Sequence, residues 1–121
     1  MALSQAPELR LRHIRDEVDA ILEATSALTF DSFGESWLVV RAVEHGPLII
    51  SEAARALPGE LKACQPSIPW RQIEAQGNFL RHEYRDVDPG ILWRIVQDDL
   101  PPLEAAAGHM LAELDRRGEG S

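Results

Sequence analysis

Apolar and polar side chains alternate along most of this chain with the period of an α-helix. From Glu8 to about Leu28, apolar residues recur every three or four positions, and charged residues occupy most of the positions between them. This spacing gathers the apolar side chains on one face of a helix. The sequence therefore predicts a first amphipathic helix, with an apolar stripe formed by Leu11, Ile14, Val18, Ile21, Leu22, Thr25 and Leu28.

A second helix is predicted after a connector at residues 29–34. Ser32 and Glu35, three residues apart, fit a capping box, and Asp31 is an alternative N-cap. We expect this helix to run to about residue 57 and to kink at Gly46-Pro47, because proline lacks an N–H and clashes with the preceding turn. Its core stripe is expected to consist of Trp37, Val40, Val43, Ile50, Ala54 and Leu57.

Prolines mark the start of a third helix. Residues 58–69 contain three prolines and one glycine, which predicts a long loop with room for one helical turn at Glu60–Ala63. Because proline is tolerated in the first turn of a helix, the third helix is expected to run from about Pro69 to Arg85.

Prolines also shape the last part of the chain. Asp88-Pro89 is typical of a helix start, with aspartate as the N-cap and proline in the first turn. Pro101-Pro102 should then break or kink this fourth helix, which is expected to resume to about Arg116.

These features predict an all-α protein. No segment alternates apolar and polar residues with a period of two between turn residues, so no strand is predicted. Four main helices with mostly short connectors are expected to form an up-and-down four-helix bundle with kinked second and fourth helices. The 121 residues leave little room for a second domain, so we expect one domain over residues 1–121 with an ordered core at about 8–116.

Composition narrows the function classes. The formal net charge of −8 argues against a protein that coats nucleic acid through a basic face, although it allows a local site built from a few arginines. Cys64 is the single cysteine, which excludes an internal disulfide and favours a cytoplasmic location. Neither a signal peptide nor a membrane-spanning run is evident. His13, His45 and His109 show no metal-ligand spacing, so we expect neither a metal site nor a cofactor.

The third predicted helix carries a polar cluster. At about 100° per residue, Asn78 and His82 share one surface with Arg71 and Arg85, and Arg81 lies between this surface and the apolar stripe. Glycine in a helix interior costs roughly 1 kcal/mol relative to alanine, so a glycine in the apolar stripe predicts a close backbone approach. The stripe consists of Trp70, Ile73, Gly77, Leu80 and Tyr84.

Asn78, Arg81 and His82 have the chemistry for metal-independent cleavage of RNA. A histidine can take the 2′-hydroxyl proton or donate one to the leaving oxygen, and an arginine can stabilise charge on the phosphate oxygens. An asparagine can orient either group. One histidine per chain supplies only one of the two proton-transfer groups that acid-base catalysis uses, whereas a symmetric dimer would supply two histidines. Such a dimer would also bury Gly77, Leu80 and Tyr84.

Simpler explanations of the same residues stay open. A histidine beside an asparagine on a helix is more often structural than functional. Tyr84 can be a half-buried packing residue, and the arginines of this helix can form a solvated face. Glu44 and Glu52, eight residues apart in the second predicted helix, are interpreted as surface carboxylates.

Five segments, in this order, resemble the HEPN superfamily and, within it, the HepT-like proteins. They are Leu11–Ile14, Val40–Glu44, Ile49–Ala54, Ile68–Ile73 and Gly77–Tyr84. The resemblance covers nearly the whole chain and implies a HEPN-type four-helix bundle that is usually dimeric. It also implies a toxin-like protein that pairs with a minimal nucleotidyltransferase antitoxin of the MntA type.

The family signature is an arginine, four intervening residues, a histidine, one residue and a tyrosine. By position, His82 corresponds to the RNA-cleaving histidine and Tyr84 to the tyrosine that receives AMP from the nucleotidyltransferase. Asn78 corresponds to the asparagine that commonly follows the arginine. Gly77 stands where the family has the arginine itself. Arg81, one turn later on nearly the same face, is expected to replace it.

The leading hypothesis is an RNA endonuclease of the toxin class that AMP attachment inhibits. Arg81, rather than Arg85, would supply the missing guanidinium, and Arg71 and Arg85 would bind RNA. The alternative is a catalytically silent helical partner, or substrate-binding subunit, of the nucleotidyltransferase; Gly77 and the acidic balance favour it. A third possibility is a structural bundle whose polar stripe is simply solvated.

Overall fold

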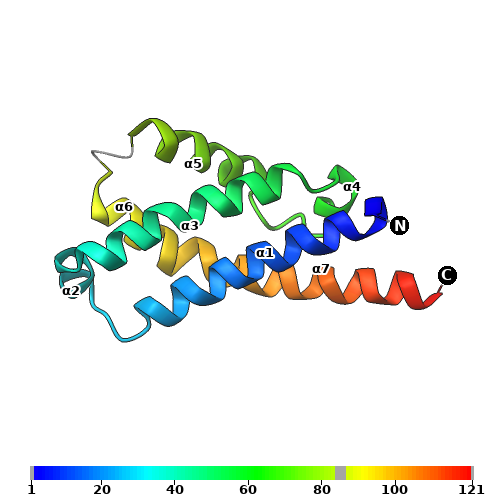
Figure 1. Ribbon diagram of the computed structural model, residues 1–121, viewed down its shortest axis with the longest axis horizontal. Helices are drawn as coiled ribbons and strands as arrows, with labels where there is room; N and C mark the ends of the chain where they lie inside the picture. Colours follow the sequence, from blue (N-terminus) through cyan, green and yellow to red (C-terminus); the bar gives the residue numbers. More distant parts are fainter. Residues whose placement is uncertain (1, 84–86, 121) are drawn as a thin grey trace.

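The computed structural model describes residues 2–83 and 87–120, and over these ranges the chain consists of helices and turns, with no strand. The predicted all-α class is therefore confirmed. The elements are α1 (Ala2–Thr25), α2 (Phe30–Glu35), α3 (Trp37–Arg55), α4 (Gly59–Lys62), α5 (Trp70–Glu83), α6 (Pro89–Arg94), the π-helix η1 (Ile95–Asp99) and α7 (Leu100–Gly120) (Figure 1).

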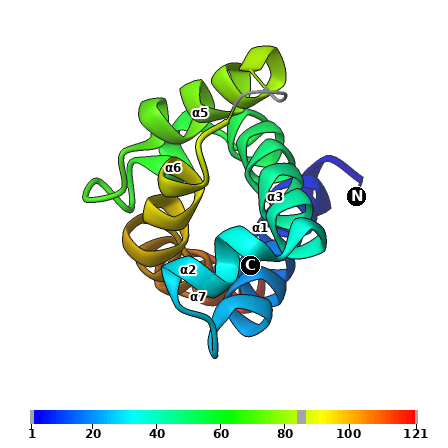
Figure 2. The same ribbon diagram turned by 90° about the vertical axis from the view of Figure 1, so that its left-hand side faces the viewer.

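The long helices run along the long axis of the molecule. Viewed from one end, α3 lies between α5 and α1, and α6 and α7 complete a ring of helices (Figure 2). α1 begins and α7 ends at one end of the molecule, whereas α2 and the start of α6 lie at the other (Figure 1). α5 packs chiefly on α3, so α3 determines how the face of α5 is presented.

The apolar stripe of α1 forms the centre of the core. Leu11, Ile14 and Val18 are fully buried and Ile21 is nearly so, as their spacing predicted. The helix ends at Thr25, earlier than expected, and the buried Thr25 hydroxyl donates to the Ile21 carbonyl at 2.8 Å. A threonine hydroxyl that donates to the carbonyl four residues earlier can be buried in the core without an unpaired donor.

Residues 30–35, predicted as part of a connector, form the short helix α2. The predicted caps are wrong, because Thr29 is the N-cap and forms the capping box with Ser32. Thr29 Oγ1 accepts from the Ser32 N–H at 3.2 Å, and Ser32 Oγ accepts from the Thr29 N–H at 2.8 Å. The helix turns Phe33 into the core, where its ring lies 5.2 Å from that of Trp93, and this burial explains why the segment is helical.

α3 starts at Trp37, after the N-cap Ser36, whose hydroxyl accepts from the Val39 N–H at 3.4 Å. Trp37 was expected in the core stripe, but it is 69% exposed, and the Arg41 guanidinium lies 5.5 Å above its ring. Pro47 is buried inside a helix that continues on both sides of it. The other stripe positions are buried or half-buried, as predicted: Val40, Val43, Ile50, Ala54 and Leu57.

The last helical run contains a π-helix immediately before Pro101 and Pro102. Asp88 caps α6 as predicted, because its carboxylate accepts from the Gly90 N–H at 2.9 Å. The expected break at Pro101-Pro102 is instead the wider turn of η1, after which the Leu100 N–H donates to Ile95, five residues back. Prolines lack the N–H that an α-helical ladder needs, so this local widening allows the chain to stay helical.

The closest approach between α3 and α5 lies at Ser51 and Gly77. A Cβ atom added to Gly77 would overlap Ser51 Oγ and Ser51 Cβ, so only glycine fits without a shift of the neighbouring helix. Ser51 is buried, and its hydroxyl donates to the Glu74 carbonyl at 3.0 Å. The predicted close approach at Gly77 is therefore confirmed.

The same contact corrects one expectation about dimerisation. Gly77 is buried, and Leu80 is only 2% exposed, so both are already covered within a single chain. Neither residue therefore needs a second copy to cover it. The apolar side of α5 is satisfied by packing on its own bundle.

We predict that Gly77→Ala lowers the free energy of unfolding by about 1–2 kcal/mol. The added methyl group overpacks the contact with Ser51, and this outweighs the roughly 1 kcal/mol that alanine adds to helix propensity. Urea denaturation followed by circular dichroism would measure the change. Removing the opposing side chain in Ser51→Gly/Gly77→Ala should recover part of the loss.

Gly108 in α7 provides the matched control. A Cβ atom at Gly108 would meet no neighbouring atom, so Gly108→Ala should stabilise the protein by up to about 1 kcal/mol. Equal stabilisation by both alanine substitutions would show that the contact at Gly77 does not constrain the helices.

Candidate functional site

α5 presents a polar outer face. Arg71, Asn78 and His82 are exposed, and Asn78 and His82 lie one turn apart on this face. Within the described part of the chain, neither the Asn78 nor the His82 side chain forms a hydrogen bond. Both are therefore accessible to a ligand. Tyr84 and Arg85, the other two predicted site residues, lie outside the described residues.

The start of α5 is anchored by Trp70. Its indole N–H donates to the Lys62 carbonyl at 3.1 Å and to the Gln65 carbonyl at 3.2 Å. These bonds connect the helix to the turn after α4, whose single turn of helix was predicted. A donor-only indole satisfied in this way holds a large half-buried side chain in one orientation. These two hydrogen bonds therefore restrict rotation of α5 about its own axis, and so help to fix the direction in which its polar face points.

Arg81 is turned toward α3 and forms an ion pair with Glu52. Arg81 Nη2 lies 2.9 Å from Glu52 Oε1, and both side chains remain accessible. Sequence reasoning interpreted Glu52 only as a surface carboxylate. The two residues are 29 positions apart and belong to different helices, so no local spacing signals their contact.

Further polar contacts lie along the line where α3 packs on α5, beside Ser51 and Gly77, which we call the seam. Arg55 Nη2 donates to the Glu74 carbonyl at 3.0 Å, which also accepts from Ser51. Lys62 Nζ lies 3.5 Å from the Glu74 carboxylate. Arg55 belongs to α3 and Lys62 to α4, so Glu74 connects α5 to both of these helices.

Position 77 of α5 faces α3 and leaves no room for a side chain. Gly77 packs against Ser51, so a side chain at this position has no path to the surface. Arg81 lies one helical turn later, on the same α3-facing side, as its contact with Glu52 shows. Arg81 therefore brings a guanidinium to the side of α5 that faces α3, one turn after Gly77.

An open groove lies between α3 and the C-terminal part of α5. Its volume is about 260 Å³, and it is lined by Arg41, Glu44, His45, Leu48, Leu80 and Val87. Arg41 and Glu44 form an ion pair at 3.0 Å. His45, which was treated as an isolated histidine, thus lies in the same groove as the buried side of α5, although no spacing in the sequence indicates this.

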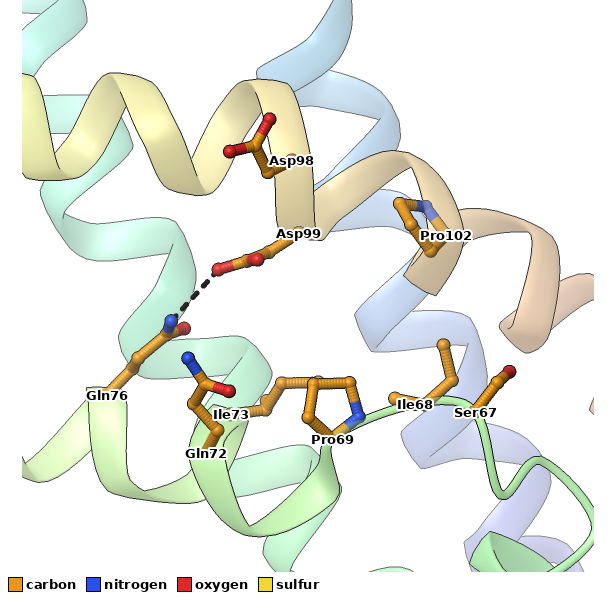
Figure 3. A pocket seen from close by; sticks show the side chains of 9 residues that line it. All are labelled: Ser67, Ile68, Pro69, Gln72, Ile73, Gln76, Asp98, Asp99 and Pro102. Atoms are coloured by element: carbon orange, nitrogen blue, oxygen red, sulfur yellow. Dashed lines mark hydrogen bonds between the residues drawn. The ribbon is translucent and has the colours of Figure 1, made fainter.

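A second cavity lies on the other side of α5, toward η1. It has a volume of about 320 Å³ and combines the apolar residues Ile68, Pro69, Ile73 and Pro102 with the polar residues Ser67, Gln72, Gln76, Asp98 and Asp99 (Figure 3). Gln76 Nε2 donates to Asp99 Oδ2 at 3.0 Å. This bond links α5 to the π-helix, so the cavity is separate from the contact between Arg81 and Glu52.

The clearest carboxyl pKa shifts lie away from α5. A hydrogen bond with Asp19 of α1, followed by partial burial and the like charge, raises the pKa of Glu104 in α7. Hydrogen bonding and charge attraction from Arg116 lower the pKa of Glu113. These carboxyl groups adjust contacts between α1 and α7 and within α7, not the polar face of α5.

Metal-binding and membrane-spanning features can be judged for the described part of the chain. Over residues 2–83 and 87–120, no group of three or more histidine, cysteine, aspartate or glutamate side chains is arranged to hold a metal ion. Over the same ranges, no helix is both long and apolar enough to cross a membrane.

Comparison with known proteins identifies the family. Residues 14–110 match the HepT-like family, described as "Ribonuclease HepT-like". A Thermococcus cleftensis protein named "Probable ribonuclease HepT" is 34% identical over 98 residues, which cover 78% of this chain and 86% of that protein. A "Putative RNase" from Caldanaerobacter subterraneus subsp. tengcongensis is 29% identical over 107 residues, covering 88% and 96% of the two chains. No solved structure gives a significant match.

The sequence similarity to proteins named as ribonucleases thus extends over most of this chain. This chain belongs to the HepT-like ribonuclease family, as its sequence segments predicted.

We predict that Glu104→Gln makes the protein more stable than wild type at pH 7. A carboxyl whose pKa is raised by folding favours the folded state while protonated, and this contribution is lost as pH rises through the folded-state pKa. Glutamine stays neutral, so the advantage should shrink toward pH 4. Thermal melts across this range would measure it. Glu113→Gln is the control of opposite sign, because the pKa of Glu113 is lowered and its charged form stabilises the fold at pH 7.

Proposed function

We propose that this protein is a toxin-type RNA endonuclease that cleaves without a metal ion. In this proposal His82 transfers protons, Arg81 stabilises charge on the phosphate, and Asn78 orients the histidine or the phosphate. The observation that carries it is that Asn78, Arg81 and His82 are all exposed within the last turns of α5, where Arg81 also forms an ion pair with Glu52. Membership of the HepT-like ribonuclease family supports the same reaction class.

The reaction is a transesterification within the RNA strand. His82 takes the proton of a ribose 2′-hydroxyl while the 2′-oxygen attacks the adjacent phosphorus, and the bond to the 5′-oxygen breaks. The products are a 2′,3′-cyclic phosphate and a 5′-hydroxyl, whose proton comes from a protonated histidine. A homodimer would supply that second histidine, which one chain lacks on this face. The Arg81 guanidinium would stabilise the additional negative charge on the phosphate oxygens.

RNA binding in this proposal is local. Arg71 lies exposed on the outer face of α5 with His82, and Arg85 extends the same predicted stripe beyond the described residues. With a net charge of −8, the chain as a whole repels RNA, so these arginines supply the attraction near the site. Because few phosphates are neutralised, binding should weaken only moderately as the salt concentration rises.

Regulation is proposed to act at Tyr84. A minimal nucleotidyltransferase of the MntA type would transfer AMP from ATP to the Tyr84 hydroxyl, two residues after His82, with release of pyrophosphate. The added phosphate places negative charge beside the RNA-binding arginines and would repel the substrate. The proximity of Tyr84 to His82 in the sequence supports a direct effect on cleavage.

A second function is favoured by one observation. Gly77 is buried at the position of the family arginine, so the family constellation is incomplete in its usual form. A catalytically silent partner or substrate-binding subunit of the nucleotidyltransferase would tolerate this loss. The decision between the two functions therefore depends on whether Arg81 can act in place of the arginine.

We predict that the purified protein, free of any partner, cleaves single-stranded RNA. His82→Ala should lower the cleavage rate by about 10²–10⁴-fold, because it removes the proton-transfer group. Arg81→Ala should lower it by about 10²–10³-fold through loss of charge stabilisation. Gel electrophoresis of end-labelled RNA would measure the rates.

His109→Ala is the matched control, because His109 is also exposed but lies on α7. Its activity should equal that of wild type. If wild type, His82→Ala and Arg81→Ala cleave at the same rate, the assignment is wrong. If none of them cleaves under any condition, the silent-partner function replaces it.

We predict that co-expression with a nucleotidyltransferase from the neighbouring reading frame adds one or more AMP units to the protein. Intact-mass spectrometry would detect them, and Tyr84→Phe should abolish the addition, since phenylalanine lacks the acceptor hydroxyl. Native mass spectrometry of the same sample would show whether two copies associate. An unmodified wild-type mass, or a modified Tyr84→Phe protein, would contradict the proposed regulation.

A further inference from the structure

Glu52 is the one residue of α3 that reaches the candidate catalytic arginine among the described contacts. We infer that Glu52 is a positioning residue, which holds the Arg81 guanidinium beside His82 in the orientation needed to meet a phosphate. This inference rests on the proposed function. It assigns a role in the reaction to a carboxylate that lies outside the arginine, histidine and tyrosine signature.

The seam between α3 and α5 determines where the Glu52 carboxylate lies. Ser51, the preceding residue, is buried against Gly77 and bonded to the Glu74 carbonyl. The backbone at Glu52 is therefore fixed relative to α5, and its side chain leaves the seam toward solvent. In consequence, the carboxylate stands at a defined distance from the helical turn that carries Arg81.

The ion pair leaves most of the Arg81 guanidinium available. Arg81 contacts Glu52 through Nη2, and 49% of its side chain remains exposed. A guanidinium has five N–H donors in a planar fork, so one bond to a carboxylate leaves donors for phosphate oxygens. Glu52 can thus orient the group while RNA binds to its free edge.

Positioning matters here because the arginine comes from an unusual place. The Arg81 guanidinium is carried on a long flexible stem, which allows it many orientations. An exposed ion pair adds little to folding stability. Its value lies in reducing the orientations that the guanidinium samples before the transition state forms.

The opposite role for Glu52 predicts different kinetics. A carboxylate near the site could act mainly by repelling RNA, in which case its removal would strengthen binding and accelerate cleavage. A positioning role predicts that kcat falls while KM stays the same or decreases. The separation of kcat from KM therefore distinguishes the two roles.

The test uses Glu52→Gln, Glu52→Asp, Arg81→Ala and the double variant Glu52→Gln/Arg81→Ala. We expect Glu52→Gln to lower kcat about ten-fold, because a less restrained guanidinium spends less time in the productive geometry. The shorter carboxylate of Glu52→Asp should retain part of the rate. The double variant should be no slower than Arg81→Ala, because Glu52 acts only through Arg81.

Glu44→Gln is the matched control. Glu44 lies eight residues earlier in α3 and also forms an ion pair with an arginine, Arg41, at 3.0 Å. The substitution removes the same charge from the same helix without touching Arg81, so kcat should not change. Circular dichroism melts would establish that each variant is folded.

NMR gives a readout that does not depend on cleavage. The side-chain Nε–H signal of Arg81 should show restricted motion in wild type and increased motion in Glu52→Gln, while the control Glu44→Gln leaves it unchanged. Unchanged motion in Glu52→Gln would overturn the inference, even if the rate fell.

The outcomes separate the inference from the function on which it rests. If His82→Ala abolishes cleavage but Glu52→Gln retains the wild-type kcat, the positioning role is wrong and the proposed function stands. Additive losses in the double variant would likewise reject action through Arg81. If wild type does not cleave, or His82→Ala cleaves equally well, the function fails and the inference fails with it.

Discussion

The contact between Ser51 and Gly77 is the interaction on which the rest of the candidate site depends. It brings the backbones of α3 and α5 together, and it places the Glu74 carbonyl where Ser51 and Arg55 both reach it. α5 packs chiefly on α3, so the orientation of its polar outer face follows from this seam. A small residue at one point of one helix thereby determines which side chains face solvent several residues later.

Electrostatics adds a second constraint. A chain with a net charge of −8 cannot attract RNA as a whole, and the cations of α5 are partly matched by carboxylates of α3. Attraction is therefore confined to a short range around Arg71, Arg81 and His82, because charges in water are screened beyond about 10 Å. Recognition by such a surface relies on geometry at the site more than on long-range attraction.

Residue patterning predicts the parts of this structure that depend on local physics. The stripe of α1, the Asp88 cap and the close approach at Gly77 all follow from spacing or from the cost of a residue type. Local rules failed at the start of α2, where Ser32 or Asp31 was expected as the N-cap, whereas Thr29 is the N-cap and Phe33 is buried.

Contacts between distant parts of the chain could not be predicted in this way. Periodicity does not show where along a helix the packing against other helices ends, so Trp37 was wrongly predicted to lie in the core. The ion pair of Glu52 with Arg81 and the position of His45 in the groove depend on how α3 and α5 pack, which no local pattern encodes. The roles of Tyr84 and Arg85 stay predictions.

The buried glycine also has an evolutionary consequence. Because Ser51 occupies the space beside position 77, any side chain at 77 would require a change at position 51 or a shift of α3. The two positions are epistatic, and the helix opposite would have to change first.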